Sequence, residues 1–414
     1  MILKNGWIFD GLNFYPEKKD IRVEEKIIKD IGKNITPLEN EEILDCKDKM
    51  ILPGLTNTHT HVVMNLLKGY GEDKSFYEWL FKEINPREDE LNGKDFYWGA
   101  MLGILELSRR GITHFVDMYM GCDQIAQAVG NSGLKALITR GITNIDGEYA
   151  RIMKNAREFI SKYKDSYNGR IQVGLGPHSA YTLSLSDLSK ISNYALKNDL
   201  PLTMHLYETK KEYETINIEE IERTGILNNK IIIAHGTNID EKIVEVFKRN
   251  NTNVSINVRS NMKLGNGFPP YKMYKDKNIN ITIGTDGSCS NNSLDVLKDA
   301  NDYFLVSKAK DPSFIKVEDI YKLLWKNVSE IGFLGNKILK RNNFADLIII
   351  DTNNPWYHPF EPKKLFHNLI LSGNSTDVFA TMINGRWIYY NGEYETVDIK
   401  EVYYNVKKIR NRIN

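Results

Sequence analysis

Two histidines separated by a single residue, His59 and His61, follow an apolar run in the segment ILPGLTNTHTHVVMNLLKGY, although the chain has only eight histidines. Alternate residues of a β-strand point to the same face, so the two imidazoles can point the same way. Neutral imidazole is a common ligand of zinc and iron, and a catalytic metal site usually combines three or more protein ligands with a position for water. The pair therefore predicts part of a divalent metal site, which His205 and Asp286 would complete.

The elements that must position these residues are eight short apolar runs rich in β-branched residues, which alternate with helical stretches from residue 51 onwards. They are MILPGLTNTH, GITHFVDM, LKALITRGI, IQVGLGPH, PLTMHLYE, KIIIAHG, NVSINV and NITIGTDG. Parallel strands that are buried on both faces read as near-continuous apolar runs. Eight strand and helix alternations predict an α/β fold, specifically a (β/α)8 TIM-like barrel.

Six polar residues occur at corresponding ends of the predicted strands. They are His59, His61, His178, His205, His235 and Asp286. Catalytic side chains of such barrels lie where the strands end, on the face built by the following loops. A His-x-His pair alone is weak evidence, but six residues at the same end of a barrel are hard to obtain by chance. Three other histidines, His114, His358 and His367, are interpreted as structural.

The N- and C-terminal parts of the chain have a different pattern, with short strands separated by tight turns. Residues 1–50 contain an Asn-Gly pair in ILKNGWIF and two short strands across a charged turn in IRVEEKIIKDI. Residues 344–414 contain the strand FADLIIIDT and two Asn-Gly turn signals in VFATMINGRWIYYNGEY. We predict that these parts form one small β-sandwich domain beside a barrel of residues 51–343. Asp398, three residues before Glu401, is expected to cap a C-terminal helix.

Composition narrows the possible partners. The 55 basic and 54 acidic residues give a formal net charge of +1, which provides no general attraction for nucleic acid or anionic membranes. No uncharged apolar run is long enough to span a membrane. The three cysteines, Cys46, Cys122 and Cys289, are scattered without a CxxC pair, which is typical of reducing compartments. We expect a cytoplasmic protein that binds a small molecule, with homo-oligomerisation left open.

Longer motifs in these segments resemble the metal-dependent amidohydrolase superfamily, in the branch that contains S-adenosylhomocysteine and methylthioadenosine deaminases and the triazine chlorohydrolases. The resemblance covers nearly the whole chain. Its carriers are LPGLTNTHTHVVMNLLKGYGED, GITHFVDMY, GLGPHSAYTLS, MHLYETKKE, IIIAHGTNI, SNMKLGNG, IGTDGSCSNNSLD and FADLIIIDTNNP.

The resemblance implies one catalytic metal, usually zinc, for which the same donor set also allows iron or manganese. The implied ligands are His59, His61, His205 and Asp286. The implied substrate is a small nucleoside, an adenosine derivative whose 6-amino group is removed by hydrolysis to give the inosine product and ammonia.

Three residues carry the implied chemistry of this deamination. Glu208, three residues after His205, is the proton shuttle, His235 orients the reacting water, and Asp286 accepts the proton that the water releases. Metal coordination lowers the pKa of bound water toward neutrality, and a carboxylic acid can protonate a purine ring nitrogen and then help ammonia leave. Because ETKKEYE is a charged run, the alternative interpretation of Glu208 is an exposed, solvated carboxylate.

The same resemblance implies further contacts with the substrate. Glu88, in NPREDEL, matches the position that binds the ribose hydroxyls, and a bidentate carboxylate suits a vicinal diol. Trp79, His178 and His205 are implied to lie against the ligand, although a tryptophan in FYEWLF is otherwise simply a core residue.

Two arginines bear on which adenosine derivative is bound. Arg140, in LITRG, and Arg151 could pair with the amino-acid carboxylate of S-adenosylhomocysteine, since guanidinium groups match carboxylates. If neither arginine reaches the pocket, methylthioadenosine or adenosine becomes as favourable a substrate. An unpaired arginine is otherwise an ordinary surface residue.

The chain departs from the family pattern near the expected pocket. Relatives usually have Ser-His-Asn-Pro where this chain has Ser255-Ile256-Asn257-Val258, and Asn238 stands where a second histidine usually follows the sixth run. None of these residues is an implied metal ligand. The departures at Ile256, Val258 and Asn238 leave the pocket wall, and hence the exact substrate, open.

Alternative functions stay open from the sequence. A related hydrolase could act on another amino- or chloro-substituted heterocycle of triazine or pyrimidine type, although Glu88 has no obvious use on a substrate without a sugar. Cyclic-amide hydrolases usually bridge two metals with a carboxylated lysine, and no lysine ends the fourth run at GPHS. A binding protein that has lost catalysis is the third class, and it is disfavoured because every implied ligand and the acid are present.

Overall fold

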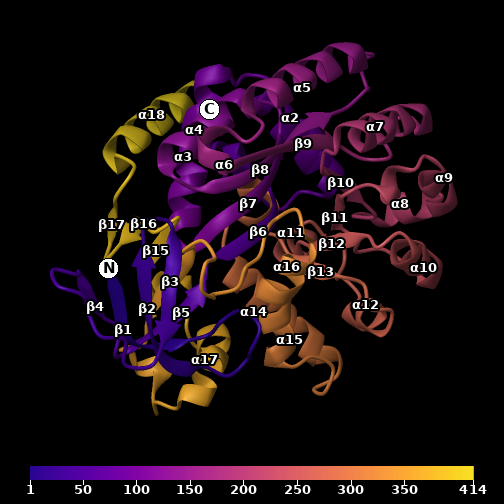
Figure 1. The fold of residues 1–414 in the computed structure, drawn as a ribbon. Helices are drawn as coiled ribbons and strands as arrows, with labels where there is room; N and C mark the ends of the chain where they lie inside the picture. The colour runs from indigo at the N-terminus through magenta and orange to yellow at the C-terminus, as the bar shows by residue number, and fades with distance from the viewer. Residues whose placement is uncertain (414) are drawn as a thin grey trace.

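Eight parallel strands form the central sheet of the protein, in a computed structural model that describes residues 1–413 (Figure 1). Each strand pairs with its neighbour in the chain, so the order of the strands in the sheet, from β6 to β13, is their order in the sequence. The strands are β6 (Leu55–Thr60), β7 (Ile112–Tyr119), β8 (Lys135–Ile142), β9 (Ile171–Pro177), β10 (Leu202–Leu206), β11 (Ile231–His235), β12 (Asn253–Ile256) and β13 (Ile281–Ile283). Just beyond β13, the N–H groups of Thr285 and Asp286 donate to the carbonyl of His59 at 3.1 and 3.0 Å, which joins the two ends of the sheet. The predicted barrel is confirmed.

Helices follow the strands and surround the barrel (Figure 1). The longer ones are α3 (Gly93–Arg109), α4 (Cys122–Ser132), α5 (Tyr149–Tyr163), α7 (Leu185–Asn198), α10 (Glu241–Arg249) and α14 (Val296–Lys310). The shorter ones are α1 (Phe76–Glu78), α2 (Asn85–Glu88), α6 (Ser166–Gly169), α8 (Lys210–Thr215), α9 (Ile218–Arg223), α11 (Val258–Lys263), α12 (Tyr271–Asp276), α13 (Ser288–Asn291), α15 (Val317–Tyr321), α16 (Asn327–Glu330) and α17 (Leu365–Leu371). Among the described residues, no helix has the length and apolar character that crossing a membrane requires.

Helix α10 illustrates why these segments are helical. Its apolar residues recur at helical spacing, and Ile243, Val244, Val246 and Phe247 are buried against the barrel while the charged residues between them face outward. The side chain of Asp240 accepts a hydrogen bond from the N–H of Ile243 at 2.9 Å, which caps the first turn.

A second, mixed sheet combines the two ends of the chain, and Figure 1 shows its indigo N-terminal strands beside the yellow C-terminal ones. Its strands are β1 (Ile2–Ile8), β2 (Glu17–Glu24), β3 (Ile27–Gly32), β4 (Ile43–Asp45), β5 (Lys49–Pro53), β14 (Leu347–Asp351), β15 (Val378–Ile383), β16 (Arg386–Tyr390) and β17 (Glu393–Tyr394). Strand β5 pairs with β14, and buried side chains from both ends of the chain share one apolar core. Asp398 caps α18 (Ile399–Arg412) through its side chain, as expected. The division of the chain at residues 50/51 and 343/344 stays a prediction.

The run MILPGLTNTH, predicted as one barrel strand, is divided between the two sheets. Strand β5 ends at Pro53 in the mixed sheet, and β6 begins the barrel at Leu55. Gly54 lies between them, where a Cβ atom would collide with the side chain of Thr113. The close approach of β7 at this point therefore requires glycine and breaks the strand.

The Asn5-Gly6 pair is not a hairpin turn. Both residues lie inside β1, where the pairing with β2 shifts register between Leu3 and Gly6 and Asn5 has a φ of 64°. The pair therefore forms a β-bulge, for which a left-handed residue is typical. In contrast, Asn384-Gly385 and Asn391-Gly392 are turns between β15, β16 and β17, as predicted.

Candidate active site

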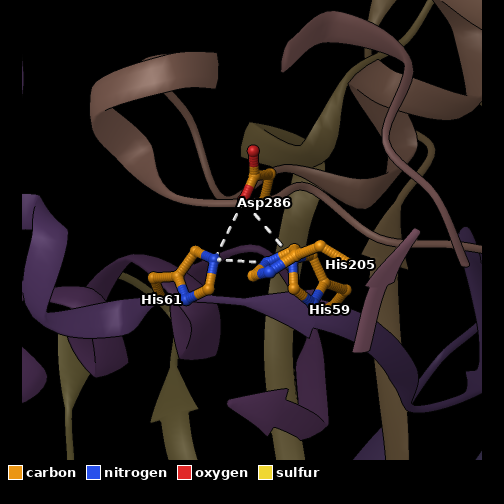
Figure 2. A group of neighbouring side chains, drawn as sticks. All are labelled: His59, His61, His205 and Asp286. Atoms are coloured by element: carbon orange, nitrogen blue, oxygen red, sulfur yellow. Dashed lines mark hydrogen bonds and ion pairs between the residues drawn. The ribbon is translucent and has the colours of Figure 1, made fainter. Parts of the chain in front are cut away.

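Four polar side chains converge at the C-terminal ends of the barrel strands, and Figure 2 shows them pointing toward one another. They are His59, His61, His205 and Asp286. One ligand atom from each lies within 4.8 Å of the others, and all four residues are at least partly buried. The structure therefore brings together the four residues predicted to form the metal site.

The hydrogen bonds behind the histidines determine which ring nitrogens face the cluster. Nδ1 of His61 lies 2.6 Å from the carbonyl oxygen of Met118, and Nδ1 of His205 lies 2.9 Å from that of His178. A carbonyl only accepts, so both Nδ1 atoms carry hydrogen and the Nε2 atoms of neutral rings present lone pairs. These two Nε2 atoms are 3.3 Å apart.

A cation satisfies this arrangement, because two lone pairs that face each other at this distance need a positive centre between them. The Asp286 carboxylate supplies negative charge at the same point, with Oδ1 at 3.4 Å from His59 Nε2 and 3.2 Å from His61 Nε2. Burial by itself lowers the pKa of His61, but the hydrogen bond and charge of Asp286 raise it to about 9. The cluster therefore attracts positive charge at this point, which either a proton on Nε2 or a metal ion can supply. Three imidazoles and a carboxylate are a donor set suited to zinc or another divalent transition metal, so the residues fit the implied metal.

The other carboxylate oxygen of Asp286 is held by two hydroxyl groups. Ser260 and Ser290 donate to Oδ2 at 2.6 and 2.9 Å. Asp286 itself has a left-handed φ of 63°, a conformation that residues other than glycine seldom adopt and that clusters at functional sites. These contacts orient Oδ1 toward the histidines and support Asp286 as a ligand.

Glu208 lies just after β10, with its carboxyl group turned into the site rather than toward solvent. Only 5% of the residue is exposed, so the alternative interpretation of a solvated carboxylate is wrong. Oε1 accepts a hydrogen bond from Asn266 Nδ2 at 3.0 Å, and Oε2 lies 3.5 Å from His235 Nε2. Burial, together with the charges of Asp286 and Glu212, raises the pKa of Glu208 well above its usual value. Its carboxyl group is therefore protonated more easily than that of an exposed glutamate.

His235, the last residue of β11, is buried beside the metal cluster. Its Nδ1 lies 3.0 Å from Asn261 Oδ1, which only accepts, so Nδ1 carries the hydrogen and Nε2 faces Glu208 with a lone pair. Burial lowers the pKa of His235 and favours the neutral ring. Its φ of 76° is left-handed, like that of Asp286. A neutral imidazole fixed in one orientation can accept a hydrogen bond from a reacting water.

Glu88 lies at the end of α2, directly after the π-helical turn η2 (Trp79–Ile84). Such turns occur frequently at functional sites. The hydroxyl of Tyr119, at the end of β7, donates to the Glu88 carboxylate. Burial raises the pKa of Glu88 to about 7, while the hydrogen bond from Tyr119 and the charge of His61 oppose the increase. Trp79 is buried, and the centroid of its indole ring lies 6.2 Å from the centroid of the Phe76 phenyl ring.

The remaining predicted substrate residues lie in different environments. His178 is partly buried, its Nδ1 is 3.1 Å from the Ser179 hydroxyl, and burial lowers its pKa to about 4. Arg140 is partly buried in β8, and its guanidinium donates to the carbonyl of Gly141. Arg151 is on the surface of α5, with 64% of its side chain exposed and an ion pair to Glu148. Burial, and to a smaller extent the charge of the exposed Arg151, lower the pKa of Arg140, so the two arginines lie near each other.

Several contributing residues were not singled out from the sequence. Three of them, Ser260, Asn261 and Asn266, lie in the loop and helix after β12 and hold Asp286, His235 and Glu208 respectively. All three belong to SNMKLGNG, a motif that was recognised without roles for its residues. A cluster of polar residues directly after a predicted barrel strand is the signal that could have identified them.

The departures from the family pattern have structural roles here. Asn238 donates through Nδ2 to the carbonyls of Glu208 and Asn266 at 2.7 and 2.8 Å, so it connects the loops that carry these two residues. Ile256 is buried at the end of β12, and Val258 is buried at the start of α11.

The fold and the site together define a barrel with a cluster of side chains that could hold a metal ion at the C-terminal ends of its strands. The chain belongs to the amidohydrolase family, whose model matches residues 50–388. Metal dependence and hydrolytic chemistry are properties of that family.

Two curated relatives are similar over almost their whole length. The 5-methylthioadenosine/S-adenosylhomocysteine deaminase of Thermotoga maritima is 36% identical, covering 100% of this chain and 99% of the relative. The 5'-deoxyadenosine deaminase of Methanocaldococcus jannaschii is 34% identical, covering 94% of each chain.

Solved structures share the fold at lower identity. A zinc-bound adenosine deaminase from Xanthomonas campestris has a TM-score of 0.92 at 22% identity, covering 100% of this chain and 98% of that one. A zinc-bound atrazine chlorohydrolase from Arthrobacter aurescens has a TM-score of 0.89 at 17% identity, covering 99% of each chain. At these identities the likeness concerns the fold alone.

Proposed function

We propose that this protein is a hydrolytic deaminase of adenosine derivatives, which converts the 6-amino group of methylthioadenosine, S-adenosylhomocysteine or adenosine to a carbonyl and releases ammonia. The observation that carries the proposal is the buried Glu208 carboxyl, held by Asn266 beside the metal donor set, with its pKa raised well above its usual value. The names of the relatives support the same substrate class.

The donor set formed by His59, His61, His205 and Asp286 would hold one divalent metal, and we propose zinc. A bound metal of this kind lowers the pKa of a water molecule and makes it nucleophilic at neutral pH. The chain's own residues then position the water, supply protons and bind the purine nucleoside.

Addition of water to the purine forms a bond between its oxygen and C6. Glu208 donates its proton to the adjacent ring nitrogen, so that the C6 centre can become tetrahedral without building negative charge on the ring. Asp286 accepts the proton lost by the water, and His235 Nε2 accepts a hydrogen bond that orients the oxygen. The C6–N bond then breaks, and ammonia leaves after receiving that proton. The proton that remains on the C6 hydroxyl returns to the Glu208 carboxylate, which restores the acid and leaves a carbonyl at C6.

A direct test measures ammonia release and the loss of adenine absorbance from zinc-loaded protein given S-adenosylhomocysteine, methylthioadenosine and adenosine in parallel. Turnover of at least one nucleoside supports the proposal. Turnover of none of the three by metal-loaded protein would contradict the nucleoside assignment and favour another amino- or chloro-substituted heterocycle.

Recognition of the ribose by Glu88 leads to a prediction. Glu88→Gln removes the negative charge that can bind two neighbouring hydroxyl groups, so kcat/KM for methylthioadenosine should fall roughly 10- to 100-fold, as expected for losing hydrogen bonds to a charged group. The same substitution should change kcat/KM for 2',3'-dideoxyadenosine by much less. The exposed Glu90→Gln serves as the matched control. An equal loss on both substrates would show that Glu88 does not act through the ribose.

The environment of Arg140 leads to a second prediction. Among the described residues, its guanidinium has no carboxylate partner, so it is available to the carboxylate of S-adenosylhomocysteine. Arg140→Met should raise KM for S-adenosylhomocysteine roughly 10- to 100-fold, the loss typical of a charged hydrogen bond. KM for methylthioadenosine, which has no carboxylate, should stay unchanged. The exposed Arg157→Met should change neither value, and equal KM values for Arg140→Met and the unmodified protein would rule Arg140 out.

A further inference from the structure

A cavity of about 260 Å³ opens at the N-terminal ends of the barrel strands, opposite the metal cluster. Its wall includes residues near the start of β7, β8 and β9 and the segment 334–346, which leads from the barrel into β14. The cavity therefore lies between the barrel and the mixed sheet. None of the roles proposed above uses it.

The charged groups around this cavity are mostly cationic. Three of them, Lys135, Arg170 and Lys337, carry positive charge, and Asp346 is the one carboxylate in the lining described by the structure. The Asp346 carboxylate is paired with Lys135 and also accepts the N–H of Asn384 at 2.8 Å. Arg170 is held by hydrogen bonds to the carbonyls of the α4 region, the longest being 3.0 Å. An excess of positive charge therefore remains in the lining.

Lys337 is the cation of the lining whose charge is least compensated. The residue is 8% exposed, and its ammonium donates to Nδ1 of the buried His114 at 2.9 Å. Within residues 1–413, Lys337 has no carboxylate in ion-pair contact, and Asp346 acts on it only from a longer distance. A buried charge that has no ionic partner is costly. Burial lowers the pKa of Lys337 to about 8, while Asp346 opposes this and Lys135 adds to it.

His114 adds a second donor at the same wall. Since Nδ1 accepts from the ammonium, the hydrogen of the neutral ring is on Nε2. This buried Nε2 has no well-aligned acceptor among the described residues. Burial lowers the pKa of the ring, and the carbonyl of Leu334, which is close enough for a hydrogen bond, opposes that decrease. The lining thus offers a buried ammonium and an imidazole N–H, both of which an oxygen acceptor would satisfy.

We propose that this cavity is a binding site for a phosphate group, either as inorganic phosphate or as a small phosphate monoester, with Lys337 as its principal cation. A phosphate dianion offers several acceptor oxygens and the charge that the lining lacks. Because the lining comes from both the barrel and the approach to β14, the bound anion would also connect these two parts of the protein.

The test is calorimetric titration of the zinc-loaded full chain with inorganic phosphate and, separately, with methyl phosphate, using chloride at matched ionic strength as the reference. One saturable site per chain is expected, and Lys337→Met should weaken it at least about tenfold, as for a lost charge-assisted contact. The exposed Lys340→Met is the matched control and should bind as the unmodified protein does. The deaminase activity of Lys337→Met shows whether that variant is folded.

Asp346→Asn should change the affinity for phosphate in the direction opposite to Lys337→Met. It removes the carboxylate of the lining and frees Lys135, so phosphate should bind more tightly than to the unmodified protein. A preference for methyl phosphate would identify an esterified ligand, and a preference for inorganic phosphate would identify the free ion; either supports the site. Absence of saturable binding would overturn the proposal. Affinity that is unchanged in both Lys337→Met and Asp346→Asn would also overturn it and would place the phosphate elsewhere, such as at the metal centre.

Discussion

Glu208→Gln is expected to lower kcat for deamination of methylthioadenosine by roughly 10²- to 10⁴-fold, the contribution typical of a general acid. Glutamine keeps the shape of the side chain and can still accept the hydrogen bond from Asn266, but it has no carboxyl proton to donate. The loss should therefore appear in kcat, while KM and the zinc content stay close to those of the unmodified protein. Steady-state kinetics with metal analysis of the same samples measure all three quantities.

Glu214→Gln is a matched control for this experiment. Glu214 lies in the same segment of the chain but is exposed and pairs with Lys210, so its replacement should leave kcat unchanged. Retention of full activity by Glu208→Gln would show that another group supplies the proton. Loss of zinc from Glu208→Gln would instead indicate that the residue is needed to keep the metal bound.

Asp286→Asn is expected to abolish activity and to reduce bound zinc well below one per chain. The substitution removes the negative charge that faces His59 and His61 and disturbs the carboxylate held by Ser260 and Ser290. Zinc binding by the unmodified protein should also stabilise the fold, by roughly 4 kcal/mol when free zinc is about 1,000-fold above its Kd. Zinc content, activity and thermal unfolding with and without added zinc measure these effects.

The control is His358→Gln, which removes an exposed histidine outside the metal cluster. This variant should retain zinc and activity. Removal of the metal from the unmodified protein by a chelator should reproduce the loss seen in Asp286→Asn, and added zinc should restore activity in the unmodified protein alone. Full activity in chelated protein that contains no metal would contradict the metal-dependent mechanism.

The barrel and the metal ligands could be predicted from local patterns alone. Parallel strands buried on both faces are apolar throughout, so the eight runs indicate a barrel without knowledge of their neighbours. Residues at the ends of parallel strands meet at one face of such a barrel. For this reason His59, His61, His205 and Asp286 could be placed together from sequence, although the first and the last are more than 200 positions apart.

Features that depend on contact between distant segments could not be predicted from local sequence patterns. Gly54 looks like part of a continuous strand, and only the close approach of Thr113 shows why the chain changes sheets there. Asn5-Gly6 has the composition of a hairpin turn, but pairing of β1 with β2 makes it a bulge. Local sequence describes what a segment can adopt, whereas the neighbouring strand decides between the alternatives.

The same distinction holds within the site. Periodicity and positions at strand ends predict the fold and the four candidate metal donors, whereas the role of Glu208 as an acid is implied by the family resemblance. Tertiary contacts establish the rest: Glu208 is buried rather than solvated, Asn266 and Asn261 hold Glu208 and His235, and Arg151 lies at the surface. Burial and hydrogen-bond geometry arise from packing between loops that are far apart in the chain, and these are the properties that set the protonation state of an acid.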